Sequence, residues 1–230
     1  MLIIPRGLEI MIYLTTLVMI KNDWILVFFI IIFSLLAIVK WLYKERLFNL
    51  VTIYFSKDYF LKYGKENQLI FNWFNAVLFF IQSVIIGFLF LAYCIFYKPE
   101  IIQQNSLQLF LKSILFVSLF FLVRYVVGKV LAIIFEINKQ HEHLAFAKIS
   151  YLYSSILLII PFTFSTFYIK TYNLLAFQLT IAIFTILLII RYVVVFNNNN
   201  KTIFSRLFYF ILYFCALEIA PVLLVLKQVV

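Results

Sequence analysis

The chain has 230 residues, of which 66% are hydrophobic and only 12% are charged. Ordinary soluble domains are roughly half apolar and about a quarter charged, and a small soluble body cannot hide so much apolar surface. The composition therefore excludes a soluble globular protein and indicates a membrane protein. We assign the net charge of +10 to basic loops beside anionic lipid rather than to nucleic acid, because the sequence contains no nucleic-acid-binding motif.

Residues 1–23 contain one apolar run, Ile10–Ile20, which is shorter than the roughly 20 residues that a membrane span requires. Three interpretations stay open: an interfacial segment on the periplasmic side, a signal peptide, or a true start at Met11. Glu9 and the lack of a small-residue cleavage site argue against a signal peptide. We therefore favour the interfacial segment.

Six apolar runs are long enough to cross a hydrocarbon core about 30 Å thick. They cover residues 24–43, 71–93, 109–127, 151–169, 174–192 and 207–226. Backbone groups in lipid must form hydrogen bonds within the segment, so continuous runs of this kind are helices. The sequence thus predicts an all-α integral membrane bundle, with residues 24–230 forming a single domain of about six transmembrane helices.

The distribution of Lys and Arg residues between the loops predicts how the chain is oriented in the membrane. With the N-terminus outside, most Lys and Arg residues fall in the three loops on the inner side, as the positive-inside rule requires. This places both chain termini on the outer side of the membrane.

The loop after the first span predicts an amphipathic helix on the cytoplasmic side. Its apolar residues repeat at helical spacing: Leu47, Leu50, Val51, Tyr54 and Phe55. Such a helix is expected to lie in the interface with its apolar face in lipid. A second amphipathic candidate, around Leu131 and Ile134, could instead continue the third span to Ile137. We expect anionic headgroups to contact five cationic side chains: Lys44, Arg46, Lys57, Lys62 and Arg191.

Glu218 is the most informative residue, because it falls near the middle of the last span. An ionisable group there costs about 2.5–3.5 kcal/mol on insertion scales and usually faces a partner or a cavity. Two interpretations stay open: a functional ion pair, proton site or subunit contact, and a protonated carboxyl bonded to a neighbouring helix. Pro221 follows three residues later and frees a carbonyl in the preceding turn.

Two further cations, Arg124 and Lys112, complete the predicted intramembrane polar site. Arg124, near the inner end of the third span, either extends to the interface or pairs with a carboxylate such as Glu136. Arg191 ends the fifth span and fits a positive-inside anchor. Lys112 lies closer in depth to Glu218, so a Lys112–Glu218 pair is a candidate contact.

No pattern of catalytic or metal-binding residues stands out. The run His141-Glu142-His143 fits a solvated turn better than a metal site, which needs three or four ligands in defined geometry. Nucleophile, zinc-protease and nucleotide-binding motifs are missing. Hydroxyl residues of the fourth span suit helix packing better than a substrate path. We therefore expect no metal and no cofactor, and we do not favour an enzyme.

The last span reads Ile211-Leu212-Tyr213-Phe214-Cys215-Ala216-Leu217-Glu218-Ile219-Ala220-Pro221. This run resembles the closing signature of a bacterial inner-membrane family of unknown function, the domain-of-unknown-function family numbered 4271. Five other features agree with that family: the opening Asn22-Asp23-Trp24, Arg46, Phe48, Arg124 and Pro161. The resemblance implies an inner-membrane location and a shared polytopic architecture, carries no activity, and strengthens the case for Glu218 and Pro221.

Three functional hypotheses follow. The first is a non-enzymatic accessory or assembly subunit of a cell-envelope complex, with the polar-marked last helix as the contact with a protein partner. The second is a small transporter or flippase for an anionic or lipid-linked substrate, using Glu218 as the intramembrane carboxyl. The third is a membrane-embedded lipid-modifying enzyme.

Overall fold

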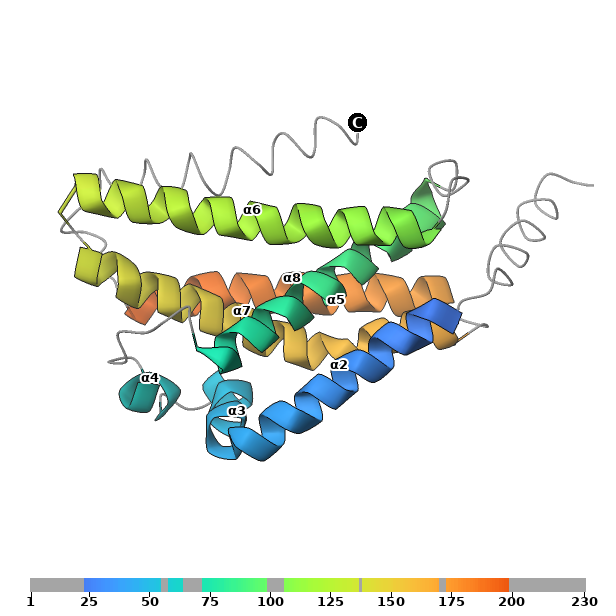
Figure 1. Cartoon of the computed structure of the whole chain (residues 1–230), viewed down its shortest axis with the longest axis horizontal. Coiled ribbons are helices and arrows are strands. Elements are labelled where there is room, and N and C mark those ends of the chain that lie inside the picture. The colour runs from blue at the N-terminus through green and yellow to red at the C-terminus, as the bar shows by residue number, and fades with distance from the viewer. Residues whose placement is uncertain are drawn as a thin grey trace, which may run out of the picture. The chain divides into compact units, whose positions relative to one another are not determined.

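The computed structural model describes residues 23–54, 58–63, 72–98, 106–136, 138–169 and 173–198. All regular structure in these ranges is helical (Figure 1), which confirms the predicted all-α membrane bundle. Several predicted features lie outside the described residues: residues 1–22, the span 207–226, Lys57, Glu218 and Pro221.

Among the described residues, five helices are long and apolar enough to cross a membrane, so the protein is a multi-pass membrane protein. They are α2 (Asp23–Leu42), α5 (Trp73–Tyr97), α6 (Ser106–Ile134), α7 (Asn138–Tyr168) and α8 (Asn173–Asn198). Helix α2 belongs to one compact unit, and the residues from Tyr43 onward form a second. Within α2, Lys40 lies in the last turn and Trp24 meets Phe28 edge to face, with ring centroids 6.2 Å apart.

Helices α6 and α7 are longer than the runs predicted for them, with 29 and 31 residues. At 1.5 Å per residue each is about 45 Å long, well beyond a hydrocarbon core of about 30 Å. Helix α6 does not reach Ile137, because the chain turns at Phe135–Glu136. Glu136 adopts a left-handed φ of 56°, which ends the helix before α7 begins.

Three short helices connect α2 to α5: α3 (Lys44–Val51), η1 (Thr52–Tyr54) and α4 (Asp58–Tyr63). The predicted amphipathic helix is present as α3, and part of its apolar face is turned toward protein. Leu50 and Ile53 are 0% and 3% exposed, and α3 and η1 pack on α7. Periodicity shows only that one face avoids water, and here part of that face is covered by protein.

Helices α5 and α7 run parallel to each other. Near the start of α5 and the middle of α7, the Tyr153 hydroxyl donates to the Asn75 carbonyl, at 3.3 Å. Near their ends, the ring centroids of Phe88 and Phe167 are 5.5 Å apart. Helix α6 runs the opposite way, since Phe110, near its start, stacks on Phe88 at 4.4 Å. This alternation is what successive membrane spans require.

Helix α8 is antiparallel to α5 and α7. Phe177, near its start, packs on Phe96 near the end of α5, with ring centroids 5.3 Å apart. The bundle therefore has two ends. We call the end where α5 and α7 begin the basic end, because it holds these described cations of α3 to α8: Lys44, Arg46, Lys62, Arg124, Lys129, Lys148 and Arg191. At the other, aromatic end, the described residues of these helices include Lys98 and Lys112 as cations.

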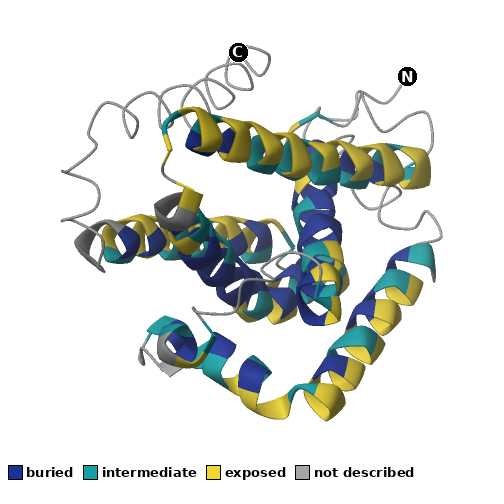
Figure 2. Cartoon of the chain, turned by 60° about the vertical axis from the view of Figure 1, so that its left-hand side comes forward, coloured by how far each residue is buried: buried dark blue, intermediate teal, exposed yellow. Residues whose placement is uncertain are grey.

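Burial divides the spans from Tyr43 onward into inner and outer helices (Figure 2). In the most apolar stretches of α5 and α7, 67% and 72% of residues are buried, against 6% and 11% in α6 and α8. The exposed residues of α6 and α8 are largely Leu, Ile, Val and Phe. In water such surfaces would aggregate, whereas in lipid they need no cover.

Candidate functional site

The segment α3–η1–α4 joins the middle of α7 through hydrogen bonds of Tyr54 and Ser154. The Tyr54 hydroxyl lies 2.6 Å from the Ser155 Oγ and donates to the Tyr151 carbonyl at 3.3 Å. The Ser154 hydroxyl donates to the Val51 carbonyl at 3.5 Å. These contacts attach the connecting segment to polar groups on α7, so the hydroxyls of α7 serve as anchoring points.

Aromatic rings extend the same contact from α4. Tyr59, only 1% exposed, stacks on Phe146 with ring centroids 5.6 Å apart and planes at 16°. Phe60 meets Tyr151 at 5.4 Å. Offset and edge contacts of this kind add about 0.5–1.5 kcal/mol each beyond the buried area. The connecting segment is therefore a packed part of the bundle.

Arg46 is held between two aromatic rings. Its guanidinium carbon lies 4.9 Å from the ring centroid of Tyr63 and 4.7 Å from that of Phe74. The side chain is only 7% exposed. Cation–π contacts strengthen when water is excluded, because the ring quadrupole is then not screened. Arg46 thus ties α3 to α4 and to the start of α5.

Arg191 is likewise buried against a ring, about two turns before the end of α8. It is 6% exposed, and its guanidinium carbon lies 5.4 Å from the ring centroid of Tyr192. Burial raises the pKa of Tyr54, while the hydrogen bond with Ser155 and the positive charge of Arg191 act in the opposite direction. Arg191 is therefore close enough to act electrostatically on the Tyr54 hydroxyl. Lys148 of α7, 8% exposed, is a third buried cation at this end.

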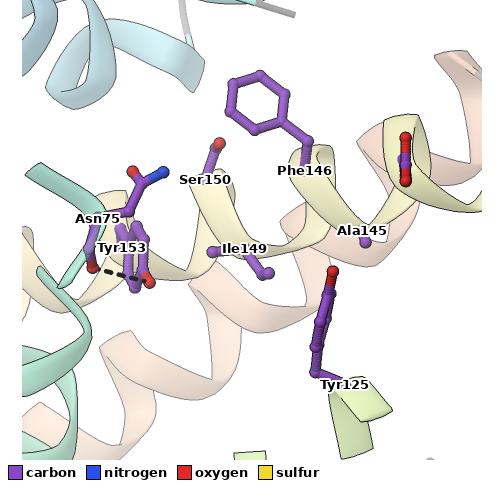
Figure 3. A pocket seen from close by; sticks show the side chains of 8 residues that line it. Asn75, Tyr125, Ala145, Phe146, Ile149, Ser150 and Tyr153 are labelled. Carbon is purple, nitrogen blue, oxygen red and sulfur yellow. Dashed lines mark hydrogen bonds between the residues drawn. The ribbon is translucent and has the colours of Figure 1, made fainter. Parts of the chain in front are cut away.

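A small cavity lies where α5, α6 and α7 meet at the basic end (Figure 3). Its volume is about 10 Å³, close to the minimum that holds one water. Tyr125 points its hydroxyl from α6 toward α7, and the Tyr153 hydroxyl reaches the backbone carbonyl of Asn75. Eight residues line the cavity: Asn75, Tyr125, Glu142, Ala145, Phe146, Ile149, Ser150 and Tyr153. It can hold a bridging water but is far too small for a lipid or a metabolite.

Most polar side chains deeper in the spans are used within their own helix. The hydroxyls of Ser83, Ser113, Thr163 and Thr180 each donate to a carbonyl three or four residues earlier. Gln82 of α5 is different. It is 2% exposed, and its Nε2 forms no hydrogen bond within the described part of the chain.

The predicted headgroup contacts divide into two groups. Lys44 and Lys62 are exposed, so they remain available to lipid headgroups. Arg46 and Arg191 are buried against aromatic rings, so in this structure their side chains point inward, and their predicted place at a lipid headgroup or interface stays a prediction. The positive-inside rule predicts the end of a helix at which a cation lies, and it does not predict whether the side chain turns inward.

The centre of the predicted intramembrane site, Glu218 and Pro221, lies outside the described residues. Lys112 is exposed on α6 and Arg124 is intermediate in burial, about 12 residues further along the same helix. The structure therefore does not bring these two cations together. Sequence analysis missed Lys148, Gln82 and the Tyr54–Ser155 contact. Gln82 carried a visible signal, since it is an amide inside a continuous apolar run.

Among the residues that the structure describes, no group of three or more His, Cys, Asp or Glu side chains could hold a metal ion. Cys94 is buried in α5 as a free thiol. What the basic end offers chemically is a set of buried cations, phenols and hydroxyls joined by hydrogen bonds and ring contacts.

Comparison with known proteins gives a family and no functional relative. Neither the curated proteins nor the solved structures include a match to this chain. A family model does match, over residues 25–229, and so covers nearly the whole sequence. The chain belongs to that family, which is described as Domain of unknown function (DUF4271).

Proposed function

We propose that this protein is a non-enzymatic accessory or assembly subunit of a cell-envelope complex in the bacterial inner membrane. The observation that carries the proposal is the use of polar groups in packing. Hydroxyls of α5, α6, α7 and α8 form bonds within their helices, and those at the basic end fasten α3–η1–α4 to α7. Helix packing of this kind builds a scaffold.

The orientation of the proposed subunit follows from its charges. The basic end holds most of the described cations of α3 to α8, and the positive-inside rule assigns such an end to the cytoplasm. Lys44 and Lys62 would then face anionic headgroups of the inner leaflet. Both chain termini would be periplasmic, and the last span would contact the protein partner.

A pull-down from native membranes in mild detergent, read by mass spectrometry, tests the proposal. The full-length chain is compared with Glu218→Gln and with a matched control, Glu45→Gln, which changes an exposed carboxyl of α3 in the same way. We expect a stoichiometric partner with the wild type and the control, and a reduced amount with Glu218→Gln. A single species without partner in all three preparations would overturn the proposal.

The buried cations favour a second candidate, a carrier for an anionic lipid or lipid-linked substrate. Arg46, Lys148 and Arg191 lie at one end of the bundle among phenols and hydroxyls that suit a phosphate group. Proteoliposomes containing a fluorescent phosphatidylglycerol test this function. Protein-dependent transfer between leaflets that falls with Arg191→Gln would support a carrier, and transfer at the rate of empty liposomes would exclude it for this lipid.

A further inference from the structure

Helix α3 and the turn η1 connect two inner helices of the bundle. Tyr43, the N-cap residue of α3, lies edge-on against Phe74 at the start of α5, with ring centroids 5.6 Å apart. At the other end, the Tyr54 hydroxyl of η1 lies 2.6 Å from the Ser155 Oγ in the middle of α7. The segment α3–η1 thus runs from one inner helix to the other.

The two attachment points lie at nearly the same depth in the bundle. Asn75 follows Phe74, and Tyr153 precedes Ser155 by two residues, which is about 3 Å along a helix axis. The Tyr153 hydroxyl donates to the Asn75 carbonyl at 3.3 Å, so the two levels meet. Helix α3 therefore runs across the bundle rather than along it (Figure 1). Since the apolar span of α5 begins at this depth, α3 lies in the plane of the membrane surface.

Helix α3 has a side that faces the bundle and a side that is open. Arg46 and Leu50 are only 7% and 0% exposed. Lys44 and Phe48, one turn apart, are both exposed, Phe48 by 68%. Phe48 lies about 160° around the helix from both Arg46 and Leu50. The open side therefore combines an aromatic ring with an ammonium group, at the depth of the membrane surface.

Trp73, the first residue of α5, adds a second exposed ring. It is 79% exposed, whereas the next residue, Phe74, is 0% exposed. The ring centroid of Phe74 lies 4.7 Å from the guanidinium carbon of Arg46, so α5 begins directly beside α3. Trp side chains gather where membrane spans meet the headgroups, because the ring is apolar and its N–H still finds an acceptor there.

The charge at this corner of the bundle is positive. Among the side chains of α3 and α4 that the structure describes, three are cations and one, Glu45, is a carboxylate. Lys44 and Lys62 are exposed, and the buried Arg46 lies between their helices, 4.9 Å from the ring centroid of Tyr63. Clusters of exposed Lys beside a membrane surface attract anionic lipid.

A phospholipid presents acyl carbon and a phosphate next to each other at this depth, and two exposed rings beside two exposed ammonium groups match both. We propose that the open side of α3, together with Trp73 and Lys62, is a binding site for an anionic phospholipid. The rings of Phe48 and Trp73 lie against the glycerol and the upper acyl chain, and the ammonium groups of Lys44 and Lys62 contact the phosphate. The inference deepens the headgroup contact of the proposed function and rests on it for the choice of the inner leaflet.

Quenching of Trp73 fluorescence by brominated lipid tests the site. The full-length chain has three Trp residues, and Trp24→Phe with Trp41→Phe leaves Trp73 as the only one. The purified protein is placed in phosphatidylcholine vesicles that contain the same fraction of brominated phosphatidylcholine or of brominated phosphatidylglycerol. We expect both lipids to quench Trp73, and the anionic lipid to quench it about twofold more strongly.

Charge variants show whether the two lysines cause the preference. Lys44→Gln with Lys62→Gln should reduce quenching by brominated phosphatidylglycerol to the level of brominated phosphatidylcholine, which itself should not change. Lys98→Gln is the matched control, because Lys98 follows α5 at the aromatic end, and it should leave the preference intact. A preference that persists in the double lysine variant would overturn the site.

The quenching itself distinguishes the other occupants of this surface. Weak quenching of Trp73 by both lipids would show that protein or water covers the ring, and emission at the wavelength of tryptophan in water would identify water. Equal quenching by the two lipids would reduce the site to ordinary contact with the bilayer. Each of these results overturns the proposal. Comparison of the wild type with Trp73→Phe gives the same information without altering α2.

The lipid site and the proposed subunit function can fail separately. The vesicles contain this chain and no other protein, so a missing partner in the pull-down leaves the quenching unchanged. Brominated lipid is present in both leaflets, so the result does not depend on how the protein inserts into the vesicles. Loss of the lipid preference would likewise leave the pull-down result intact.

Discussion

The two ends of the bundle use aromatic side chains in different ways. At the aromatic end, Phe88 stacks on Phe110 and meets Phe167, while Phe96 packs on Phe177. These rings fill space and carry no polar group. At the basic end, phenol rings surround cations and place hydroxyls against α7. The aromatic end closes the helices by packing, whereas the basic end holds a separate segment, α3–η1–α4, through directional contacts.

The comparison predicts that the largest loss of stability follows from a cavity at the aromatic end. Phe88 is 0% exposed and contacts rings on both α6 and α7. Phe88→Ala should lower the free energy of unfolding by about 3–5 kcal/mol. This change in the free energy of unfolding is measured by titrating the protein with sodium dodecyl sulfate in mixed micelles. Phe90→Ala is the control, because Phe90 is 47% exposed on the same helix, and equal losses for the two variants would contradict this picture of packing.

At the basic end the largest effect is expected at Arg46. Arg46→Met keeps most of the apolar stem but removes the guanidinium from between Tyr63 and Phe74. A desolvated cation–π contact stabilises by about 2 kcal/mol or more, and Arg46→Met should lose about that much. The same micelle titration measures it. Lys44→Met changes an exposed cation of the same helix and should stay within about 0.5 kcal/mol of wild type.

A smaller and pH-dependent effect is expected at Tyr54. Tyr54→Phe removes the hydroxyl that meets Ser155 and should cost about 1 kcal/mol near neutral pH. Burial raises the pKa of Tyr54 above its ordinary value of 10.0. The folded state then keeps the phenol proton more firmly than the unfolded state, so the contribution of Tyr54 is complete below pH 10 and is lost as the pH rises beyond it.

Unfolding measured between pH 8 and pH 11 checks this sign. Part of the alkaline loss of stability in the wild type should be absent from Tyr54→Phe. Tyr97→Phe provides the control, because Tyr97 is 54% exposed on α5. An identical alkaline profile for Tyr54→Phe and wild type would show that Tyr54 does not titrate differently in the folded state.

The membrane spans could be predicted from the sequence because bilayer thickness sets their length. The orientation of individual side chains could not, because nearly every face of these helices is apolar and lipid and protein cover such faces equally well. The apolar residues of α3 show the difficulty. Leu50 fits a helix lying on lipid, yet it packs against α7. Arg46 and Arg191 lie at the basic end, and only the structure shows them turning inward onto aromatic rings.

The smallest change in stability is expected from two cysteine replacements that test the orientation of the protein in the membrane. Lys44 is exposed at the basic end and Lys98 follows α5 at the aromatic end. Single replacements Lys44→Cys and Lys98→Cys, in a chain lacking Cys94 and Cys215, should each change stability by no more than about 0.5 kcal/mol. A membrane-impermeant maleimide added to intact spheroplasts should label Lys98→Cys at once. Lys44→Cys should react only after the membrane is broken, because the positive-inside rule puts the basic end in the cytoplasm. The reverse order of labelling would mean that the protein has the opposite orientation, with the buried cations and the segment α3–η1–α4 on the periplasmic side.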